Sequence, residues 1–161
     1  MKAFFPGSFN PFTTGHLDLL ARALTLFPEG VVVGIGYNEH KTTPADIAAR
    51  EATLKSLLDG VAGVEVMSYD GLTINAVRRT GAGVIIRGFR NAIDAEYERS
   101  LADANRMISG IDTILLPASP ELAAVSSSMV RELQHNHFDT SRWVPDASEC
   151  RRRLATAEST H

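Results

Sequence analysis

Cysteine, long apolar runs and an excess of positive charge are all missing from this sequence. The single cysteine, Cys150, excludes an internal disulfide and favours a reducing, cytoplasmic location. No apolar run reaches the roughly 18 residues of a membrane span, and residues 1–6 lack the pattern of a signal peptide. The formal net charge of −3 argues against broad binding to nucleic acids or membrane surfaces, because that needs many Lys and Arg residues.

Several familiar cofactor and catalytic motifs are absent as well. No G-x-x-x-x-G-K-[ST] segment is present, so a P-loop kinase is not expected. The Gly-Ile-Gly segment at 34–36 lies inside or at the end of an apolar run, which disfavours a dinucleotide fingerprint. No His and Cys residues have zinc-ligand spacing. Cys150 is not expected to be catalytic, because it lies beside three arginines in what is predicted to be a polar tail.

What is present is a regular alternation of short and long apolar patterns. Five runs rich in β-branched or aromatic residues, typical of strands, lie at 2–5, 31–35, 64–67, 84–86 and 113–116. Longer segments of helical spacing separate them. The 161 residues, 44% of them apolar, are therefore expected to form an α/β, Rossmann-like, doubly wound parallel sheet of about five strands with helices on both faces. Such sheets bind ligands at the carboxyl ends of their strands.

The expected helices are defined by their apolar spacing and their caps. One amphipathic helix is predicted from Leu17, Leu20, Leu24 and Phe27. A longer one is predicted from Ile93, Tyr97, Leu101, Ala104 and Ile108. Asp46 is a candidate N-cap for a helix that runs through Leu58, and residues 146–154 favour a last helix. The chain is thus expected to be a single domain over 1–154, with a flexible tail at 155–161.

The most informative stretch, residues 6–16, follows the first predicted strand and opens the first amphipathic helix. Its sequence is Pro-Gly-Ser-Phe-Asn-Pro-Phe-Thr-Thr-Gly-His. Gly7 permits close approach to a ligand, Gly15 leaves room beside the helix, and His16 lies in the first helical turn. Free N–H groups and the positive end of the helix dipole favour a phosphate there. The alternative is an ordinary strand–helix turn with a structural histidine.

Three other groups of residues have both a functional and a structural interpretation. Arg87 and Arg90 flank a glycine at the end of a predicted strand, where they would bind phosphate or pair with nearby carboxylates. Glu98, Leu101 and Asn105 share one helix face, which is either a binding surface or a solvated one. The serines at 126–128 precede a helical segment, and a helix start of this kind both caps the helix and binds phosphate.

Four segments in register resemble one known family. The loop at 7–16 resembles the signature of the nucleotidylyltransferase superfamily, and Thr13 in place of a first histidine is similar to the phosphopantetheine adenylyltransferases. The Arg-Gly-Phe-Arg segment at 87–90 with the acidic residues after it, the triple serine at 126–128, and Lys41 beyond the second strand also resemble that family. Order and spacing match from residue 2 to about 145.

The resemblance implies an enzyme that transfers the adenylyl group of ATP to 4′-phosphopantetheine, without a covalent intermediate. The implied catalytic residues are His16, Lys41 and Arg87. The implied ATP-binding residues are Ser8, Phe9, His16, Gly88, Arg90, Glu98, Ser126, Ser127 and Ser128. The implied acceptor-binding residues are Ser8, Lys41, Leu72, Thr73, Arg87 and Asn105. Mg²⁺, a homohexamer and feedback binding of coenzyme A are further expectations from the resemblance.

Two departures from the family pattern keep other functions open. The family usually has Asp where this chain has Asn10, so a role there in holding Mg²⁺ is in doubt, and no metal ligand is assigned. The segment at 121–124 is Glu-Leu-Ala-Ala, where the family often has aromatic residues, so adenine is expected to pack against aliphatic groups. The alternatives are a nucleotidyltransferase of the same superfamily with another acceptor, and a non-catalytic nucleotide-binding regulator.

Overall fold

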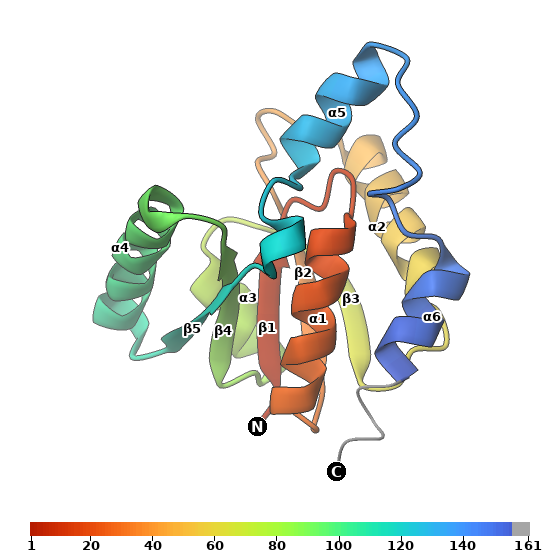
Figure 1. The fold of residues 1–161 in the computed structure, drawn as a ribbon. Helices are drawn as coiled ribbons and strands as arrows, with labels where there is room; N and C mark the ends of the chain where they lie inside the picture. Colours follow the sequence, from red (N-terminus) through yellow and green to blue (C-terminus); the bar gives the residue numbers. More distant parts are fainter. Residues whose placement is uncertain (156–161) are drawn as a thin grey trace.

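The computed structural model describes residues 1–155 and shows a parallel five-stranded sheet with helices on both faces (Figure 1). The strands are β1 (Ala3–Gly7), β2 (Val31–Tyr37), β3 (Val64–Asp70), β4 (Val84–Phe89) and β5 (Asp112–Pro117). Their order across the sheet is β3-β2-β1-β4-β5, and all neighbouring pairs are parallel. The predicted doubly wound α/β fold is confirmed. The order reverses between β1 and β4, where such sheets form their ligand sites.

Six α-helices and one short 3-10 helix connect and cover the strands within the described residues. The α-helices are α1 (Thr14–Leu26), α2 (Pro44–Leu57), α3 (Thr73–Thr80), α4 (Ala92–Ser109), α5 (Ser127–His135) and α6 (Ala147–Ala155). The 3-10 helix η1 (Pro120–Leu122) follows β5. Helix α5 projects above the end of the sheet at which β1 meets its loop (Figure 1).

The two faces of the sheet pack two separate cores, because successive strand residues point to opposite sides. On one face, Phe5 and Ile86 pack with Leu17 and Leu20 of α1 and with residues of α2 and α6. On the other face, Phe4, Val32 and Ile85 pack with α3. Strand β1 is thus fixed from both sides, and the loop that follows it within residues 7–16, predicted to bind phosphate, is called the phosphate loop below.

The structure corrects four details of the sequence-based predictions. Helix α2 starts earlier than expected: Thr43, not Asp46, is its N-cap, and Thr43 Oγ1 accepts the Asp46 N–H at 3.1 Å. Pro44 explains the shift, since its fixed φ suits the first helical position. Cys150 is buried in the core beside α1 rather than in a polar tail, and burial raises its pKa to about 11.

The other two corrections concern the end of the chain and the face of α4. Ala155, expected in the tail, is the last residue of α6, and the rest of the predicted tail, 156–161, lies outside the described residues. The apolar stripe of α4 is exposed rather than packed on the sheet, with Ile93 85% and Tyr97 61% accessible. A helical repeat shows which residues share a face but not what covers that face.

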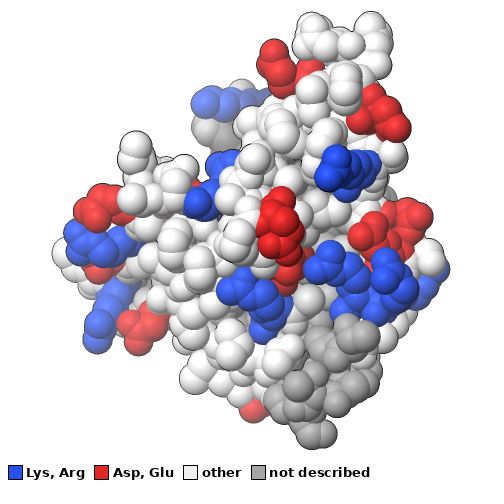
Figure 2. Space-filling view, in the orientation of Figure 1, with Lys and Arg blue, Asp and Glu red and all other residues white. Residues whose placement is uncertain are grey.

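The surface carries no broad area of one charge on the side seen in Figure 2. Lys and Arg side chains alternate there with Asp and Glu, over α4 and around α6. Among the described residues, no helix is long and apolar enough to cross a membrane.

Candidate active site

The sheet opens into a crevice at the point where its strand order reverses. Strands β1 and β4 pair only at their beginnings, Ala3 with Val84 and Phe4 with Ile85. Beyond these pairs the Arg87 side chain crosses the gap, and its Nη1 donates to the Pro6 carbonyl at 2.9 Å. A charged guanidinium therefore holds the two strands at the distance that the crevice requires.

A cavity of about 310 Å³ lies at the mouth of this crevice; we call it the central cavity. The loop after β1, the start of α1, the end of β4 and the start of α5 surround it. It brings together most of the residues that the sequence assigned to ATP, namely Ser8, His16, Gly88, Arg90, Glu98, Ser126, Ser127 and Ser128. These positions are up to 120 residues apart in the chain.

His16 belongs to a capping box at the start of α1. Thr13 is the N-cap, and its Oγ1 accepts the His16 N–H at 3.4 Å. In return, the Thr13 backbone N–H donates to His16 Nδ1 at 2.9 Å. Because Nδ1 is an acceptor in this bond, the proton of the neutral imidazole is on Nε2. The cap therefore sets the tautomer as well as the orientation of the ring.

The environment of His16 keeps the imidazole uncharged. Burial, followed by the positive charges of Arg87 and Arg90, lowers the pKa of His16 to about 4. The ring lies against Phe9 and Phe12, with centroids 5.0 and 5.5 Å away. At neutral pH the side chain is thus a neutral N–H donor at the wall of the cavity, and its low pKa makes it a poor general base.

Arg87 is fixed by a buried carboxylate on α4. Its Nε and Nη2 donate to the two oxygens of Glu98 at 2.7 and 2.6 Å, a two-pronged geometry. The Glu98 side chain is 5% exposed and that of Arg87 is 30% exposed. Glu98 is therefore first of all the residue that orients Arg87, an interpretation that the resemblance did not include.

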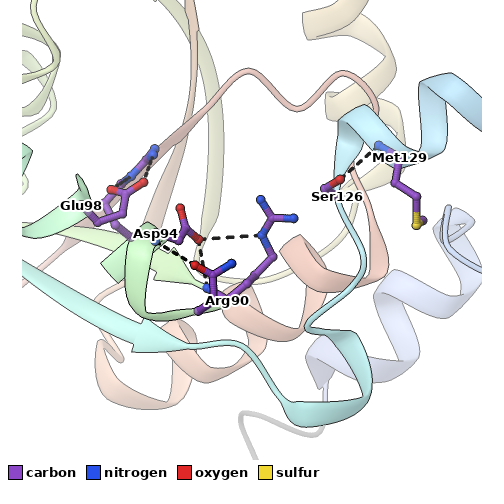
Figure 3. Close-up of polar contacts among 7 residues, drawn as sticks. Arg90, Asp94, Glu98, Ser126 and Met129 are labelled. Atoms are coloured by element: carbon purple, nitrogen blue, oxygen red, sulfur yellow. Dashed lines mark hydrogen bonds and ion pairs between the residues drawn. The ribbon is translucent and has the colours of Figure 1, made fainter. Parts of the chain in front are cut away.

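Arg90 lies on the other side of Gly88 and has a looser environment. Asp94 accepts the Arg90 backbone N–H at 2.9 Å and lies 3.8 Å from its Nε (Figure 3). The Arg90 side chain is 42% exposed, so its guanidinium is free to turn toward an anion in the cavity. The two arginines thus differ, since the guanidinium of Arg87 is held by two short hydrogen bonds to Glu98, whereas that of Arg90 has one long contact to Asp94.

The start of α5 presents backbone donors to the same cavity. Ser126 is the N-cap, and its hydroxyl accepts the Met129 N–H at 3.0 Å (Figure 3). The Ser127 hydroxyl donates to the Pro11 carbonyl at 2.8 Å, which ties α5 to the phosphate loop. The N–H groups of Ser127 and Ser128 are at the first two helical positions and have no intrahelical acceptor. Backbone groups, more than hydroxyls, are available here for phosphate oxygens.

Gly88 leaves room for a neighbouring helix. A Cβ atom at this position would lie 2.3 Å from Leu19 Cδ1, which is too close for any real contact. Leu19, Leu122 and Val125 also line the central cavity and give it an aliphatic wall. This agrees with the expectation that a base packs on aliphatic groups, which stays a prediction.

A second cavity of about 280 Å³, the α4 cavity, begins on the far side of Arg87. Its lining includes Leu72, Thr73, Leu101, Asn105 and Thr113. It shares Pro6, Arg87 and Glu98 with the central cavity, so the arginine–glutamate pair separates two spaces. Three of the residues assigned to the acceptor, Leu72, Thr73 and Asn105, therefore gather in one place.

Lys41 and Phe9 are not part of either space. Both line a third cavity of about 550 Å³, the α2 cavity, between the phosphate loop and α2. The Lys41 side chain is exposed at the carboxyl end of β2, and Phe9, 3% exposed, packs in the core against Phe5 and His16. Asn10 also lines the α2 cavity rather than the central one.

Sequence reasoning gave Arg131 no ligand role and considered Asp94 only as an ion-pair partner of the arginines, yet both residues line the central cavity. Arg131 of α5 lines it, donating to the Asn10 carbonyl at 2.5 Å and to Ser128 Oγ at 3.3 Å. Asp94 lines it as the partner of Arg90. Arg131 is five residues from the cap Ser126, so its place after a helix start predicted to bind phosphate was the available signal.

The site does not offer a dedicated metal cage. The two carboxylates that line the central cavity, Asp94 and Glu98, are each engaged by an arginine. Within residues 1–155, no group of three or more His, Cys, Asp or Glu side chains is arranged to hold a metal ion.

Comparison with known proteins agrees with this geometry. Residues 4–133 match the cytidylyltransferase-like family model. A phosphopantetheine adenylyltransferase from Bacteroides thetaiotaomicron is 46% identical, over 92% of this chain and 97% of its own length. Another from Cutibacterium acnes is 43% identical, over 90% and 92% of the two chains.

Solved structures support the fold. A putative nicotinate-nucleotide adenylyltransferase from Vibrio parahaemolyticus superposes with a TM-score of 0.60, covering 99% of this chain and 96% of its own. At 15% identity it shows the architecture alone. The curated relatives are far more similar and span nearly the whole chain, so this protein belongs to the phosphopantetheine adenylyltransferase family of cytidylyltransferase-like proteins.

Proposed function

We propose that this enzyme transfers the adenylyl group of ATP to 4′-phosphopantetheine, which yields dephospho-coenzyme A and pyrophosphate. The observation that carries the proposal is the shared wall: Arg87, fixed by Glu98, borders both the central and the α4 cavity. A nucleotide in one space and an acceptor in the other would meet at this guanidinium. Relatives more than 40% identical over about nine tenths of the chain support the choice of acceptor.

The chemistry needs neither a base nor a covalent intermediate. The acceptor phosphate is already a nucleophile at neutral pH, and it attacks the α-phosphorus of ATP in line while pyrophosphate leaves. Catalysis then consists of positioning and of stabilising charge. In this scheme, Ser8 contacts both phosphates and Arg87 binds the phosphate of the acceptor.

His16 supplies a directed donor to the α-phosphate. Its Nδ1 is occupied by the Thr13 N–H, so Nε2–H remains for a ligand in the central cavity. Negative charge grows on the α-phosphate oxygens in the transition state, and a fixed donor then binds more strongly than in the ground state. The low pKa of His16 keeps this donor neutral at physiological pH.

The leaving pyrophosphate is held at the opposite side of the central cavity. Arg90, with its exposed guanidinium, and the free N–H groups of Ser127 and Ser128 surround that end. Arg131 adds a second cation beside Ser128. Two arginines and a helix N-terminus suit a group that carries several negative charges.

A role for Lys41 in this scheme requires a movement of its loop. It lines the α2 cavity rather than the space beside Arg87, and its side chain is exposed. We propose that its loop, 38–43, carries it to the acceptor phosphate when both substrates are bound. Lys41→Ala should then lower the use of the acceptor far more than it weakens ATP binding. Unchanged turnover would remove Lys41 from the mechanism.

Mg²⁺ belongs to the proposal as a companion of ATP rather than as a resident ion. Both carboxylates of the central cavity are paired with arginines, and Asn10 has an amide where the family usually has a carboxylate. No step in the scheme above is routed through the metal. Asn10→Asp should be tolerated and should change only the dependence of turnover on Mg²⁺ concentration.

Assembly, regulation and location complete the proposal. The exposed apolar face of α4 fits a symmetric self-association, and a homohexamer is the assembly that the resemblance implies. Coenzyme A carries the same pantetheine arm as the acceptor and would compete for the α4 cavity, which gives feedback inhibition. We place the enzyme in the cytoplasm, where its substrates are made.

The decisive experiment is steady release of pyrophosphate from ATP and 4′-phosphopantetheine by the purified full chain. CTP in place of ATP, and nicotinate mononucleotide or phosphocholine as acceptor, test the related activities. Turnover with another pair and none with 4′-phosphopantetheine would overturn the proposed acceptor. ATP binding without any turnover would instead favour the non-catalytic regulator.

A further inference from the structure

The floor of the α4 cavity contains a polar group to which no motif drew attention. Thr113 of β5 lines this cavity, opposite Ile85 in the sheet register. Its Oγ1 is buried and has no hydrogen-bond partner within the described part of the chain. Its neighbours along β5, Asp112 and Ile114, point to the other face, so only Thr113 brings a side-chain hydroxyl from this strand to the cavity.

An unpaired buried hydroxyl needs an explanation. Most buried polar groups in folded proteins have a hydrogen-bond partner, because a buried group without one has lost its bonds to water and gained none in return. A valine would fill the same volume at this position without that penalty. A hydroxyl in the wall of a ligand cavity finds its partner when the ligand is bound, and rotation about one side-chain bond is the only movement that it needs.

The surroundings of Thr113 indicate which kind of ligand atom it meets. Ile85, Leu101 and Ala102 make this part of the cavity apolar. Two other neutral polar side chains line the cavity: Thr73 is hydrogen-bonded to the Tyr69 hydroxyl at 3.0 Å, whereas the Asn105 side-chain amide makes no hydrogen bond within residues 1–155. A hydroxyl and a carboxamide in an apolar lining are suited to a neutral polar group, such as an amide within an otherwise aliphatic chain.

We infer that Thr113 is a specificity-determining residue of the acceptor site and that its hydroxyl binds an amide of the acceptor arm, beside Asn105. The inference rests on the proposed function, in which the arm of 4′-phosphopantetheine extends from Arg87 into the α4 cavity. That arm alternates aliphatic segments with two amides. Thr113 acts on binding of the arm and takes no part in the phosphoryl chemistry, which happens on the other side of Arg87.

Thr113→Val, which keeps the shape and removes the hydroxyl, is the test. We expect KM for 4′-phosphopantetheine to rise about tenfold, because a neutral hydrogen bond is lost and the amide stays unpaired. Neither kcat nor KM for ATP should change. Thr113→Ser keeps the hydroxyl and should restore most of the acceptor affinity. The melting temperature of the valine variant should not fall below that of the wild type, since valine leaves no unpaired polar group.

Acceptor analogues sharpen the result and separate it from the broader proposal. Replacing each arm amide in turn by an ester or a methylene ketone should weaken binding to the wild type at one of the two positions. At that same position, Thr113→Val should be insensitive to the replacement. A valine variant with unchanged acceptor KM, beside a wild type that turns over normally, would overturn the inference. A wild type inactive with 4′-phosphopantetheine would overturn the proposed function instead.

Discussion

Helices α1 and α4 each follow one of the two strands that border the crevice, yet they bury opposite kinds of side chain. Helix α1 buries Leu17, Leu20 and Ala23 against the sheet. In α4, the buried residue is the carboxylate Glu98, while Ile93, Tyr97 and Ile108 are exposed. The two sequences nevertheless show the same apolar spacing.

The difference follows from the position of each helix in the sheet. Helix α1 follows the central strand β1 and is covered by α6, whereas α4 packs on β4 and the edge strand β5 (Figure 1). The side of α4 that faces the crevice supports an arginine, and its apolar side stays exposed in the single chain. The helical period predicts an amphipathic helix in both cases, but only the fold determines which face is the inner one.

Removing the buried carboxylate of α4 should have the largest effect on stability. Glu98→Ala leaves the partly buried guanidinium of Arg87 without its carboxylate, with only the Pro6 carbonyl as a partner, and we expect a loss of about 3–5 kcal/mol in the free energy of unfolding. Chemical denaturation measures it. Glu96→Ala on the same helix, whose partner Arg99 is 61% exposed, is the matched control and should leave stability essentially unchanged. Equal effects of the two variants would contradict the role given to Glu98.

Removing the polar residue at the start of α1 should affect chemistry rather than stability. His16→Ala should lower turnover by about 10²–10³-fold, equivalent to about 3–4 kcal/mol, as expected for the loss of one preorganised donor. ATP affinity should change only several-fold, because the donor acts most strongly in the transition state. Turnover and ATP binding are to be measured on one folded preparation. Near-normal turnover would rule out the catalytic role.

Truncating a side chain on the inner apolar face of α1 should lower the stability of the protein, because this face is part of the core. Leu20 is 0% exposed, and Leu20→Ala should lower the free energy of unfolding by about 3 kcal/mol through lost contacts and a cavity. Urea denaturation measures this loss. A variant that keeps wild-type stability would show that α1 does not fix the sheet as the packing indicates.

His16 also makes α1 sensitive to acid. The pKa of His16 is about 4 in the folded chain, below the unfolded value of 6.5, so unfolding takes up a proton between these values. Its contribution is therefore complete above about pH 6.5 and is lost as the pH falls toward 4. Between pH 7.5 and 5, wild type should lose about 2 kcal/mol more than His16→Ala. Parallel pH profiles of the two proteins would disprove the shift.

A substitution on the exposed apolar face of α4 should have the smallest effect on the stability of a single chain. Ile93 is 85% exposed, and Ile93→Ser should change the unfolding free energy of an isolated chain by no more than about 0.5 kcal/mol. Its effect should appear in assembly, as a smaller mass by sedimentation at a given concentration. If the variant assembles like wild type, a different surface joins the subunits.

The sequence was sufficient for the fold and for the parts of the site that depend on local order. The ends of strands β1 to β5 were predicted with errors of at most three residues, because apolar runs of this kind mark buried parallel strands. The phosphate loop, the arginines at the end of β4 and the serine cap of α5 lie around one cavity, since the carboxyl ends of neighbouring strands meet at one edge of the sheet.

What the sequence did not give depends on contacts between distant segments. The bond from Arg87 to Glu98 and Pro6 joins three separate elements, and spacing alone left Glu98 between a ligand contact and a solvated face. The pairing of the Thr13 N–H with His16 Nδ1 needs the exact turn of the loop. Thr113 was overlooked because a lone threonine in a strand has no pattern, and its orphaned hydroxyl is visible only in three dimensions.

Gly88 affects the size of the central cavity through a neighbouring side chain as well as through its own place in the wall. Leu19, the side chain that a Cβ at position 88 would strike, is itself part of the cavity wall. The end of a leucine side chain is easier to displace than the backbone of β4. A side chain at position 88 would therefore displace Leu19 and change the shape of the central cavity. Residues 19 and 88 share one limited volume, so a larger residue at one position requires a smaller one at the other. We therefore expect the residue types at the two positions to change together among related sequences.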